Sequence, residues 1–166
     1  MKKKILLIED NPATIDVVQK ELEFLGYESV VAEDGKEGVE KAVSYLPDLI
    51  IMDISLPKMD GLEASSLIRK NPKIQSTPIL AATARALPGD KEKCIQAGCN
   101  DYIAKPFTHR ELGAAIKKLL KEWRIANGKR RIANGGRGLF TINYLLFAGH
   151  ASQDEPIELG GKLGNQ

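Results

Sequence analysis

Short apolar runs alternate with amphipathic stretches along the first 123 residues of the chain. The apolar runs are three or four residues long and rich in branched side chains, and polar or turn-forming residues follow each one, which is typical of buried strands. The run Leu49–Met52 is the most apolar, which predicts a central strand covered on both faces. In total we predict five strands, at residues 5–8, 29–32, 49–52, 79–82 and 102–104.

The stretches between these strands carry apolar residues at helical spacing. Asn11-Pro12 offers a cap and a first-turn proline for the first helix, and Gly26 ends it. Further helices are predicted after Asp34-Gly35, over about 62–69 and from Gly89 to near Gly98. The last helix begins with a capping box and carries its apolar face as far as Trp123; the residues that define its start and face are Thr108, Glu111, Leu112, Ala115, Ile116, Leu119 and Leu120.

Five strand–helix repeats predict an α/β fold with helices on both sides of a parallel sheet. For five repeats we expect the flavodoxin-like (βα)5 three-layer sandwich, with strand order 2-1-3-4-5. In such sheets the reactive site lies at the carboxyl ends of the strands, at the switch point between strands 1 and 3.

The composition is ordinary for a globular chain of 166 residues, with 43% apolar and 28% charged residues. No apolar run is long enough to span a bilayer, and the N-terminus lacks the apolar core of a secretory signal, so we predict a cytoplasmic protein with no membrane partner. Cys94 and Cys99 are then expected to be free thiols.

Residues 124–166 differ from the rest of the chain. They are Gly-rich, hold the chain's excess positive charge and contain a near-repeat of Arg-Ile-Ala-Asn-Gly. We predict a domain at 1–123 and a poorly ordered tail at 124–166, with no room for a DNA-binding or catalytic output domain. The tail's origin stays open between a linker remnant, a docking segment and sequence not selected for folding.

Chemistry-bearing residues stand where the predicted strands end. Glu9 and Asp10 follow the first strand, Asp53 the third, Thr83 the fourth and Lys105 the fifth. Three neighbouring carboxylates would repel one another unless they bind a hard cation such as Mg²⁺. A central carboxylate can attack phosphorus, and a lysine and a hydroxyl can stabilise the transferring group. The pattern therefore predicts phosphoryl transfer to Asp53.

Four segments at these strand ends give the sequence a resemblance to a known family. Over residues 3 to about 121 the chain resembles the receiver (response regulator) domains of two-component signalling systems. The segments are ILLIEDN at 5–11, PDLIIMDISLPKMDG at 47–61, AATA at 81–84 and YIAKPF at 102–107. Together and in this order, they are a specific signal.

The resemblance implies a role for each matching residue. Asp53 would be the phosphoacceptor, and Asp10 would ligate Mg²⁺ directly. Glu9 would do so directly or through water, and the backbone carbonyl of Ser55 would complete the metal site. Lys105 would pair with the phosphoryl group, before a cis peptide bond to Pro106.

The resemblance also implies a conformational switch. Thr83 would move to hydrogen-bond the phosphoryl oxygen, and Tyr102 would then move inward, changing the face formed by helix 4, strand 5 and helix 5. The donor would be a histidine kinase or a histidine phosphotransfer protein. The changed face would bind a downstream protein partner, unless the domain is a shuttle in a multistep relay. Ser55 and Arg85 occupy positions that tune phosphoryl lifetime in this family.

Two other functions are compatible with parts of this pattern. A Mg²⁺-dependent phosphatase also uses an aspartyl nucleophile, but usually needs a second aspartate two residues later, where this chain has Ser55. We therefore expect no enzyme acting on outside substrates, only catalysis of the domain's own phosphorylation and dephosphorylation. A binding module that no longer takes phosphate would have lost Asp53, Lys105 or the acidic pair, and none is lost.

Overall fold

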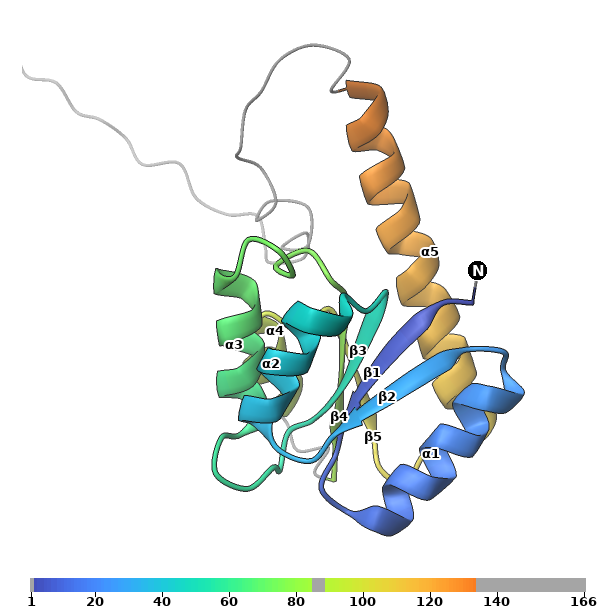
Figure 1. The fold of residues 1–166 in the computed structure, drawn as a ribbon, viewed down its shortest axis with the longest axis vertical. Helices are drawn as coiled ribbons and strands as arrows, with labels where there is room; N and C mark the ends of the chain where they lie inside the picture. Colours follow the sequence, from blue (N-terminus) through green and yellow to red (C-terminus); the bar gives the residue numbers. More distant parts are fainter. Residues whose placement is uncertain (1, 85–88, 134–166) are drawn as a thin grey trace, which may run out of the picture.

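The computed structural model describes residues 2–84 and 89–133, which form five strands and five helices in strict alternation (Figure 1). Each predicted element is present, with boundaries shifted by a few residues. The strands are β1 (Lys4–Ile8), β2 (Glu28–Ala32), β3 (Leu49–Asp53), β4 (Ile79–Thr83) and β5 (Asp101–Ala104). The helices are α1 (Pro12–Phe24), α2 (Gly35–Tyr45), α3 (Gly61–Lys70), α4 (Asp90–Gln96) and α5 (His109–Ala133).

All five strands are parallel and lie in the order β2-β1-β3-β4-β5, which confirms the predicted topology. The central strand β3 is buried along its whole length, as its apolar sequence predicts. Side chains of β1 alternate between the two faces of the sheet. Leu6 and Ile8 pack in one apolar cluster, and Ile5 and Leu7 pack in the other.

The two clusters show which helices cover each face of the sheet. One cluster contains residues of α2, α3 and α4, and the other contains residues of α1 and α5. Figure 1 shows the same division, with α1 and α5 on one side of the sheet and α2, α3 and α4 on the other. The result is the predicted three-layer sandwich.

Polar side chains cap the N-termini of α1, α2 and α5. The Asn11 side chain accepts hydrogen bonds from two backbone amides of α1, and the Asp34 side chain accepts one from α2. Thr108 and Glu111 form the predicted capping box, since the Thr108 amide donates to Glu111 at 2.7 Å and the Glu111 amide to Thr108 at 3.3 Å.

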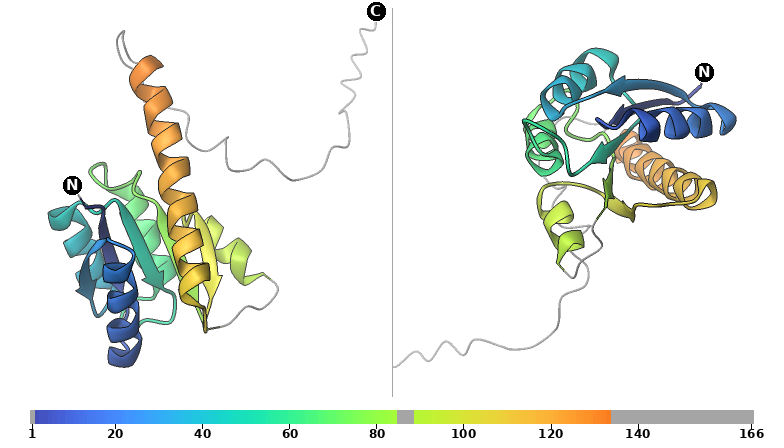
Figure 2. Two further views of the ribbon diagram at one scale, coloured as in Figure 1. Left: turned by 90° about the vertical axis from the view of Figure 1, so that its right-hand side faces the viewer. Right: turned by 90° about the horizontal axis from the view of Figure 1, so that it is seen from below.

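Helix α5 continues past the expected end of the domain at Trp123. It reaches Ala133, so the last helix is longer than its apolar face indicates. The predicted boundary between domain and tail at residue 124 stays a prediction. One glycine, Gly128, costs only about 1 kcal/mol in a helix, and no proline interrupts this stretch. The helix extends well beyond the sheet in Figure 2, and the rest of the predicted tail lies outside the described residues.

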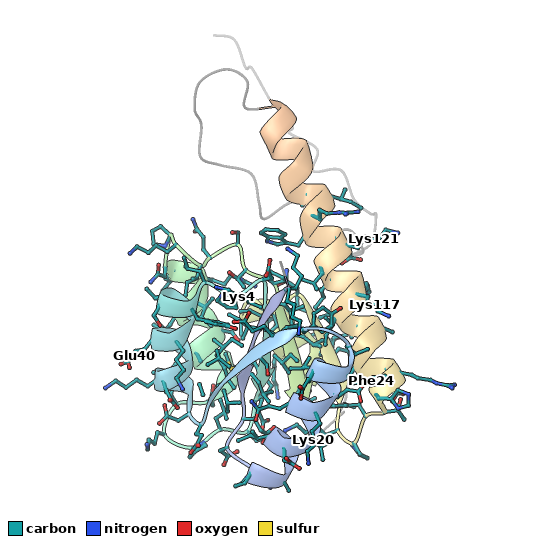
Figure 3. The ribbon with its side chains drawn as sticks, turned by 45° about the vertical axis from the view of Figure 1, so that its right-hand side comes forward. Lys4, Lys20, Phe24, Glu40, Lys117 and Lys121 are labelled. Carbon is teal, nitrogen blue, oxygen red and sulfur yellow. The ribbon has the colours of Figure 1, made fainter. Side chains whose placement is uncertain are left out.

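Trp123 attaches α5 to the body of the domain just before the helix leaves it. Its indole N–H donates to the Ser76 carbonyl, in the loop that precedes β4, at 2.8 Å. Lys117 and Lys121 lie on the side of α5 that points away from the sheet (Figure 3). Among the described residues, no helix combines the length and apolar character needed to cross a membrane.

Arg69, near the end of α3, joins three segments of the chain. Its guanidinium donates to the carbonyls of Gly98, Gln75 and Thr77 and to the side chain of Asn100, at 2.7 to 2.9 Å. These bonds fix the loop between α4 and β5 against the end of α3. Partial burial of this long cation is tolerated because oxygen acceptors surround its guanidinium group.

Candidate phosphoryl-transfer site

The strand register brings the predicted site residues to one edge of the sheet. Asp53 is the last residue of β3 and Thr83 the last of β4, and Glu9 and Lys105 directly follow β1 and β5. The Glu9 amide donates to the Ala32 carbonyl, which continues the sheet hydrogen bonding past the end of β1. The expected convergence of these residues at the carboxyl edge is therefore present.

Three carboxylates form a compact acidic cluster at this edge. Oxygen atoms of Glu9, Asp10 and Asp53 lie within 4.8 Å of one another. Glu9 is only 2% exposed and Asp53 6%, whereas Asp10 is exposed to solvent. The cluster thus has two buried carboxylates and one that is exposed to solvent.

Lys105 provides the positive charge that balances the two buried carboxylates. Its ammonium lies 2.5 Å from Glu9 Oε2 and 2.9 Å from Asp53 Oδ2. The peptide bond from Lys105 to Pro106 is cis, as the resemblance implies, and the Lys105 amide donates to the Thr83 carbonyl at 2.7 Å. Sequence reasoning placed Lys105 at this edge but did not foresee that it would bridge Glu9 and Asp53.

Backbone amides hold the other oxygen of each buried carboxylate. The Ser55 amide donates to Asp53 Oδ1 at 2.9 Å, and the Asn11 amide donates to Glu9 Oε1 at 3.1 Å. Each carboxylate is therefore fixed in orientation by one amide and one ammonium. The predicted role of the Ser55 carbonyl as a metal ligand stays a prediction.

Burial and charge act in opposite directions on the protonation of this site. Burial raises the pKa of Glu9, and the neighbouring Asp53 raises it further, while the hydrogen bond to Lys105 lowers it in part. Burial lowers the pKa of Lys105, but its hydrogen bonds and charge interactions with Glu9 and Asp53 outweigh burial and raise it. Lys105 therefore stays protonated at neutral pH.

The loop after β3 lies against Asp53 so closely that it requires a glycine. A Cβ atom on Gly61 would overlap the Asp53 carbonyl oxygen, and the Gly61 amide donates to the Ile54 carbonyl at 3.1 Å. Lys58 in this loop has a φ of 65° and pairs with Asp34 at 2.9 Å. Sequence reasoning missed this pair, because nothing in the local pattern links residues in separate loops.

The two predicted switch residues lie on the adjacent strands β4 and β5. Thr83 is buried at the end of β4, while Tyr102 on β5 is half-buried against the cluster that α2, α3 and α4 form with the sheet. The Lys91 ammonium of α4 lies 5.7 Å from the centre of the Tyr102 ring. Arg85, the predicted tuning residue, lies outside the described residues.

The donor set fits a hard divalent cation. All three acidic residues offer oxygen ligands, which Mg²⁺ prefers, and the exposed Asp10 leaves the site open on the solvent side. Two buried carboxylates with one ammonium also leave net negative charge in the cluster. A cation would offset this charge, so the residues present suit Mg²⁺.

A doubly wound parallel sheet with an acidic cluster and a lysine at its carboxyl edge is the arrangement of receiver domains, and comparison with known proteins agrees. A family model described as the response regulator receiver domain matches residues 5–117. The chain therefore belongs to the receiver-domain family of two-component response regulators. Receiver domains are signalling domains.

Two curated relatives illustrate the match. The polar-differentiation response regulator DivK of Brucella anthropi is 35% identical over 120 residues, which is 72% of this chain and 98% of DivK. The alkaline phosphatase synthesis transcriptional regulatory protein PhoP of Bacillus subtilis is 37% identical over 134 residues, or 81% of this chain. The chain spans about half of PhoP, because the match covers 55% of that protein.

Solved structures show the same fold. The receiver domain of the sensor histidine kinase PA1611 from Pseudomonas aeruginosa is 41% identical, with a TM-score of 0.69 over 73% of this chain and 99% of that one. That structure has a magnesium ion coordinated in its active-site cleft. A CheY-like receiver domain from Methanospirillum hungatei is 31% identical, with a TM-score of 0.71 over 76% of this chain and 99% of that one.

Proposed function

We propose that this domain accepts a phosphoryl group on Asp53, with Mg²⁺, from a histidine kinase or a histidine phosphotransfer protein in the cytoplasm. Phosphorylation then changes the face formed by α4, β5 and α5, and this face signals to a downstream protein. The observation that carries the proposal is the ion pair between Lys105 and Asp53 inside the acidic cluster, at 2.9 Å.

In the proposed reaction, a carboxylate oxygen of Asp53 attacks phosphorus while the bond from phosphorus to the donor's imidazole nitrogen breaks. The imidazole leaves with the electron pair of that bond, and Asp53 becomes an acyl phosphate. The Ser55 amide holds Asp53 Oδ1 at 2.9 Å and so orients the attacking carboxylate. Lys105 supplies a positive charge where negative charge gathers on the transferring group.

Glu9, Asp10, Asp53 and the Ser55 carbonyl would hold Mg²⁺, which when bound neutralises charge on the phosphoryl oxygens. Asp10 is the ligand that solvent reaches first, since it alone of the three acidic residues is exposed. When a bound cation balances the charge of Glu9, the ion pair between Glu9 and Lys105 would weaken. The ammonium would then be available to the phosphoryl group.

The proposed switch uses Thr83 and Tyr102. The Thr83 hydroxyl would bond to the phosphoryl group, and Tyr102 would move inward on β5, next to the helix α4. The strand register supports a link between the two switch residues, because Thr83 of β4 pairs with Ala104 of β5, two residues after Tyr102. The PhoP and DivK descriptions name regulators, which is consistent with a signalling role for this chain.

The test is intact-mass analysis after incubation with Mg²⁺ and a small phosphodonor such as acetyl phosphate. We expect a gain of about 80 Da that requires Mg²⁺ and disappears in Asp53→Asn. Asp16→Asn, which changes an exposed aspartate of α1, is the matched control and should gain the same mass. Absence of any gain in the wild-type chain, with the small phosphodonor and with histidine kinases alike, would refute the proposal.

A further inference from the structure

A pair of buried thiols lies at the end of α4, apart from the acidic cluster. Cys94 and Cys99 are 2% and 4% exposed, and both are free. They are the only cysteines of the sequence. Neither takes part in the chemistry proposed for Asp53, so their position needs an explanation of its own.

The backbone itself brings these two side chains together. Gly98, at a φ of 102°, ends α4, and its amide donates to the Ile95 carbonyl at 3.0 Å. The Cys99 amide donates to the Cys94 carbonyl at 2.9 Å. These two bonds form the Schellman motif of helix C-termini. In this motif the residue after the glycine contacts the residue four positions before the glycine. Cys94 and Cys99 occupy those two contacting positions.

The two sulfur atoms also interact with each other. The hydrogen bond from the Cys99 thiol lowers the pKa of Cys94, although burial opposes this, and the same bond together with burial raises the pKa of Cys99. Ionisation of one sulfur therefore disfavours ionisation of the other, and the pair holds one thiolate at most. Such a pair suits disulfide formation, in which one sulfur attacks the oxidant and the other resolves the product.

We propose that Cys94 and Cys99 are a modification site, which a hydroperoxide converts into a reversible disulfide between α4 and the loop that precedes β5. The Cys94 thiolate attacks the peroxide, its O–O bond breaks, and Cys94 becomes a sulfenic acid while hydroxide or alkoxide leaves. The Cys99 sulfur then attacks Cys94, the S–O bond breaks and water leaves, with the two thiol protons carried away by the leaving groups.

Oxidant reaches the buried pair through local opening of α4. This helix has seven residues, and its N-cap residue, Gly89, makes no side-chain hydrogen bond to it. A short helix without a cap opens at low cost compared with the sheet. Its other end is held by Arg69, which donates to the Gly98 carbonyl at 2.7 Å. The thiols thus stay paired while the first turn of α4 opens.

The disulfide would hold α4 to the loop before β5, whereas the proposed switch requires the α4–β5 face to change. Tyr102 packs against the same cluster as both cysteines. Cys99 also lies 3.4 Å from the Ser65 hydroxyl, which donates to the Gly61 carbonyl, beside Asp53. We expect the oxidised chain to take up phosphate several-fold more slowly than the reduced chain, and this expectation rests on the proposed function.

The first test oxidises the full chain with hydrogen peroxide and measures its intact mass, without any phosphodonor. We expect a loss of about 2 Da that dithiothreitol reverses. In Cys99→Ala the loss should be replaced by a gain of about 16 Da that a sulfenic-acid reagent traps on Cys94. Disulfide-linked dimers, or oxygen addition to wild-type Cys94 without the 2 Da loss, would overturn the proposal.

A second measurement does not depend on any variant folding. The chain is brought to equilibrium with mixtures of oxidised and reduced glutathione, once folded and once in concentrated urea. Because the fold pre-positions the sulfurs, the folded chain should form the disulfide at least about tenfold more favourably than the unfolded chain. Equal or weaker formation in the folded chain would show that the geometry does not favour the bond.

The coupling to phosphorylation is tested by comparing oxidised and reduced chains with acetyl phosphate and Mg²⁺. Slower mass gain in the oxidised chain supports the coupling, and equal rates refute it. If neither form gains phosphate while the disulfide still forms, the proposed function fails and the dithiol site stands. The three results can therefore be told apart.

Discussion

Replacing Lys105 by methionine tests the electrostatic description of the site. In the wild-type chain the Lys105 side chain is 19% exposed and pairs with Glu9 and Asp53, whose side chains are 3% and 7% exposed. Lys105→Met keeps most of the side-chain volume but leaves two buried carboxylates facing each other. We expect a clear loss in the free energy of unfolding, largest at neutral pH without divalent cations.

The magnitude follows from the burial of the pair. Removing one partner of a fully buried ion pair costs about 3–5 kcal/mol. Lys105 lies at the edge of the site, where solvent reaches part of its side chain, so we expect about 2–3 kcal/mol for Lys105→Met at neutral pH. Mg²⁺ should restore part of this loss, because it supplies the missing positive charge.

The loss should depend on pH in a defined direction. Burial raises the pKa of Glu9, and without Lys105 this pKa rises further. A carboxyl whose pKa is raised in the folded state favours folding at low pH, and that contribution is lost as the pH rises through the raised pKa. The deficit of Lys105→Met should therefore be small near the unperturbed pKa of 4.5 and grow toward neutral pH.

The assay is urea unfolding followed by far-ultraviolet circular dichroism, at about pH 5 and about pH 7.5, with and without Mg²⁺. Lys118→Met is the matched control, since Lys118 forms an exposed ion pair with Asp101 at 2.8 Å and should lose less than about 1 kcal/mol. A loss of equal size at both pH values, or an equal loss in Lys118→Met, would refute this account of the site.

Four further substitutions test individual contacts. Gly61→Ala should destabilise the chain by about 2 kcal/mol or more in urea unfolding, because its Cβ would overlap the Asp53 carbonyl. Gly113→Ala, whose Cβ would meet only Leu25 at 3.4 Å inside a helix, should be neutral or stabilising, and the reverse order would contradict both statements. Arg69→Ala should lower the melting temperature and lose about 3 kcal/mol, since four hydrogen bonds are removed; a loss below about 1 kcal/mol would mean that water replaces them. Trp123→Phe should cost about 1 kcal/mol and speed amide exchange in the adjoining turns of α5, and unchanged exchange would show that the indole bond does not hold the helix.

The sequence predicted the sheet and the location of the site well because both depend on short-range patterns. Each apolar run ends at a polar residue, and in a parallel sheet those ends meet at one edge. Asp53 and Thr83 could therefore be placed near each other without any contact being known. Local signals also marked where α1 and α2 begin, since Asn11 and Asp34 are caps with local partners.

What the sequence did not predict depends on contacts across long separations. The ion pair of Lys105 with Glu9 joins residues 96 positions apart, and no local pattern encodes it. The four hydrogen bonds of Arg69 likewise serve separate loops. The end of α5 was misplaced for a different reason. Its near-repeat and Gly128 suggest disorder, but the intervening alanines and basic residues favour a helix by more than one glycine disfavours it.

The contact of Trp123 with Ser76 makes the chain's intrinsic fluorescence a local reporter. Trp123 is the only tryptophan in the sequence. Its indole lies beside the loop before β4, at the opposite edge of the sheet from the acidic cluster at the carboxyl ends. Emission from this chain should therefore follow the attachment of α5 to the domain, and a spectral change on adding a phosphodonor would mean that the whole length of the sheet had responded.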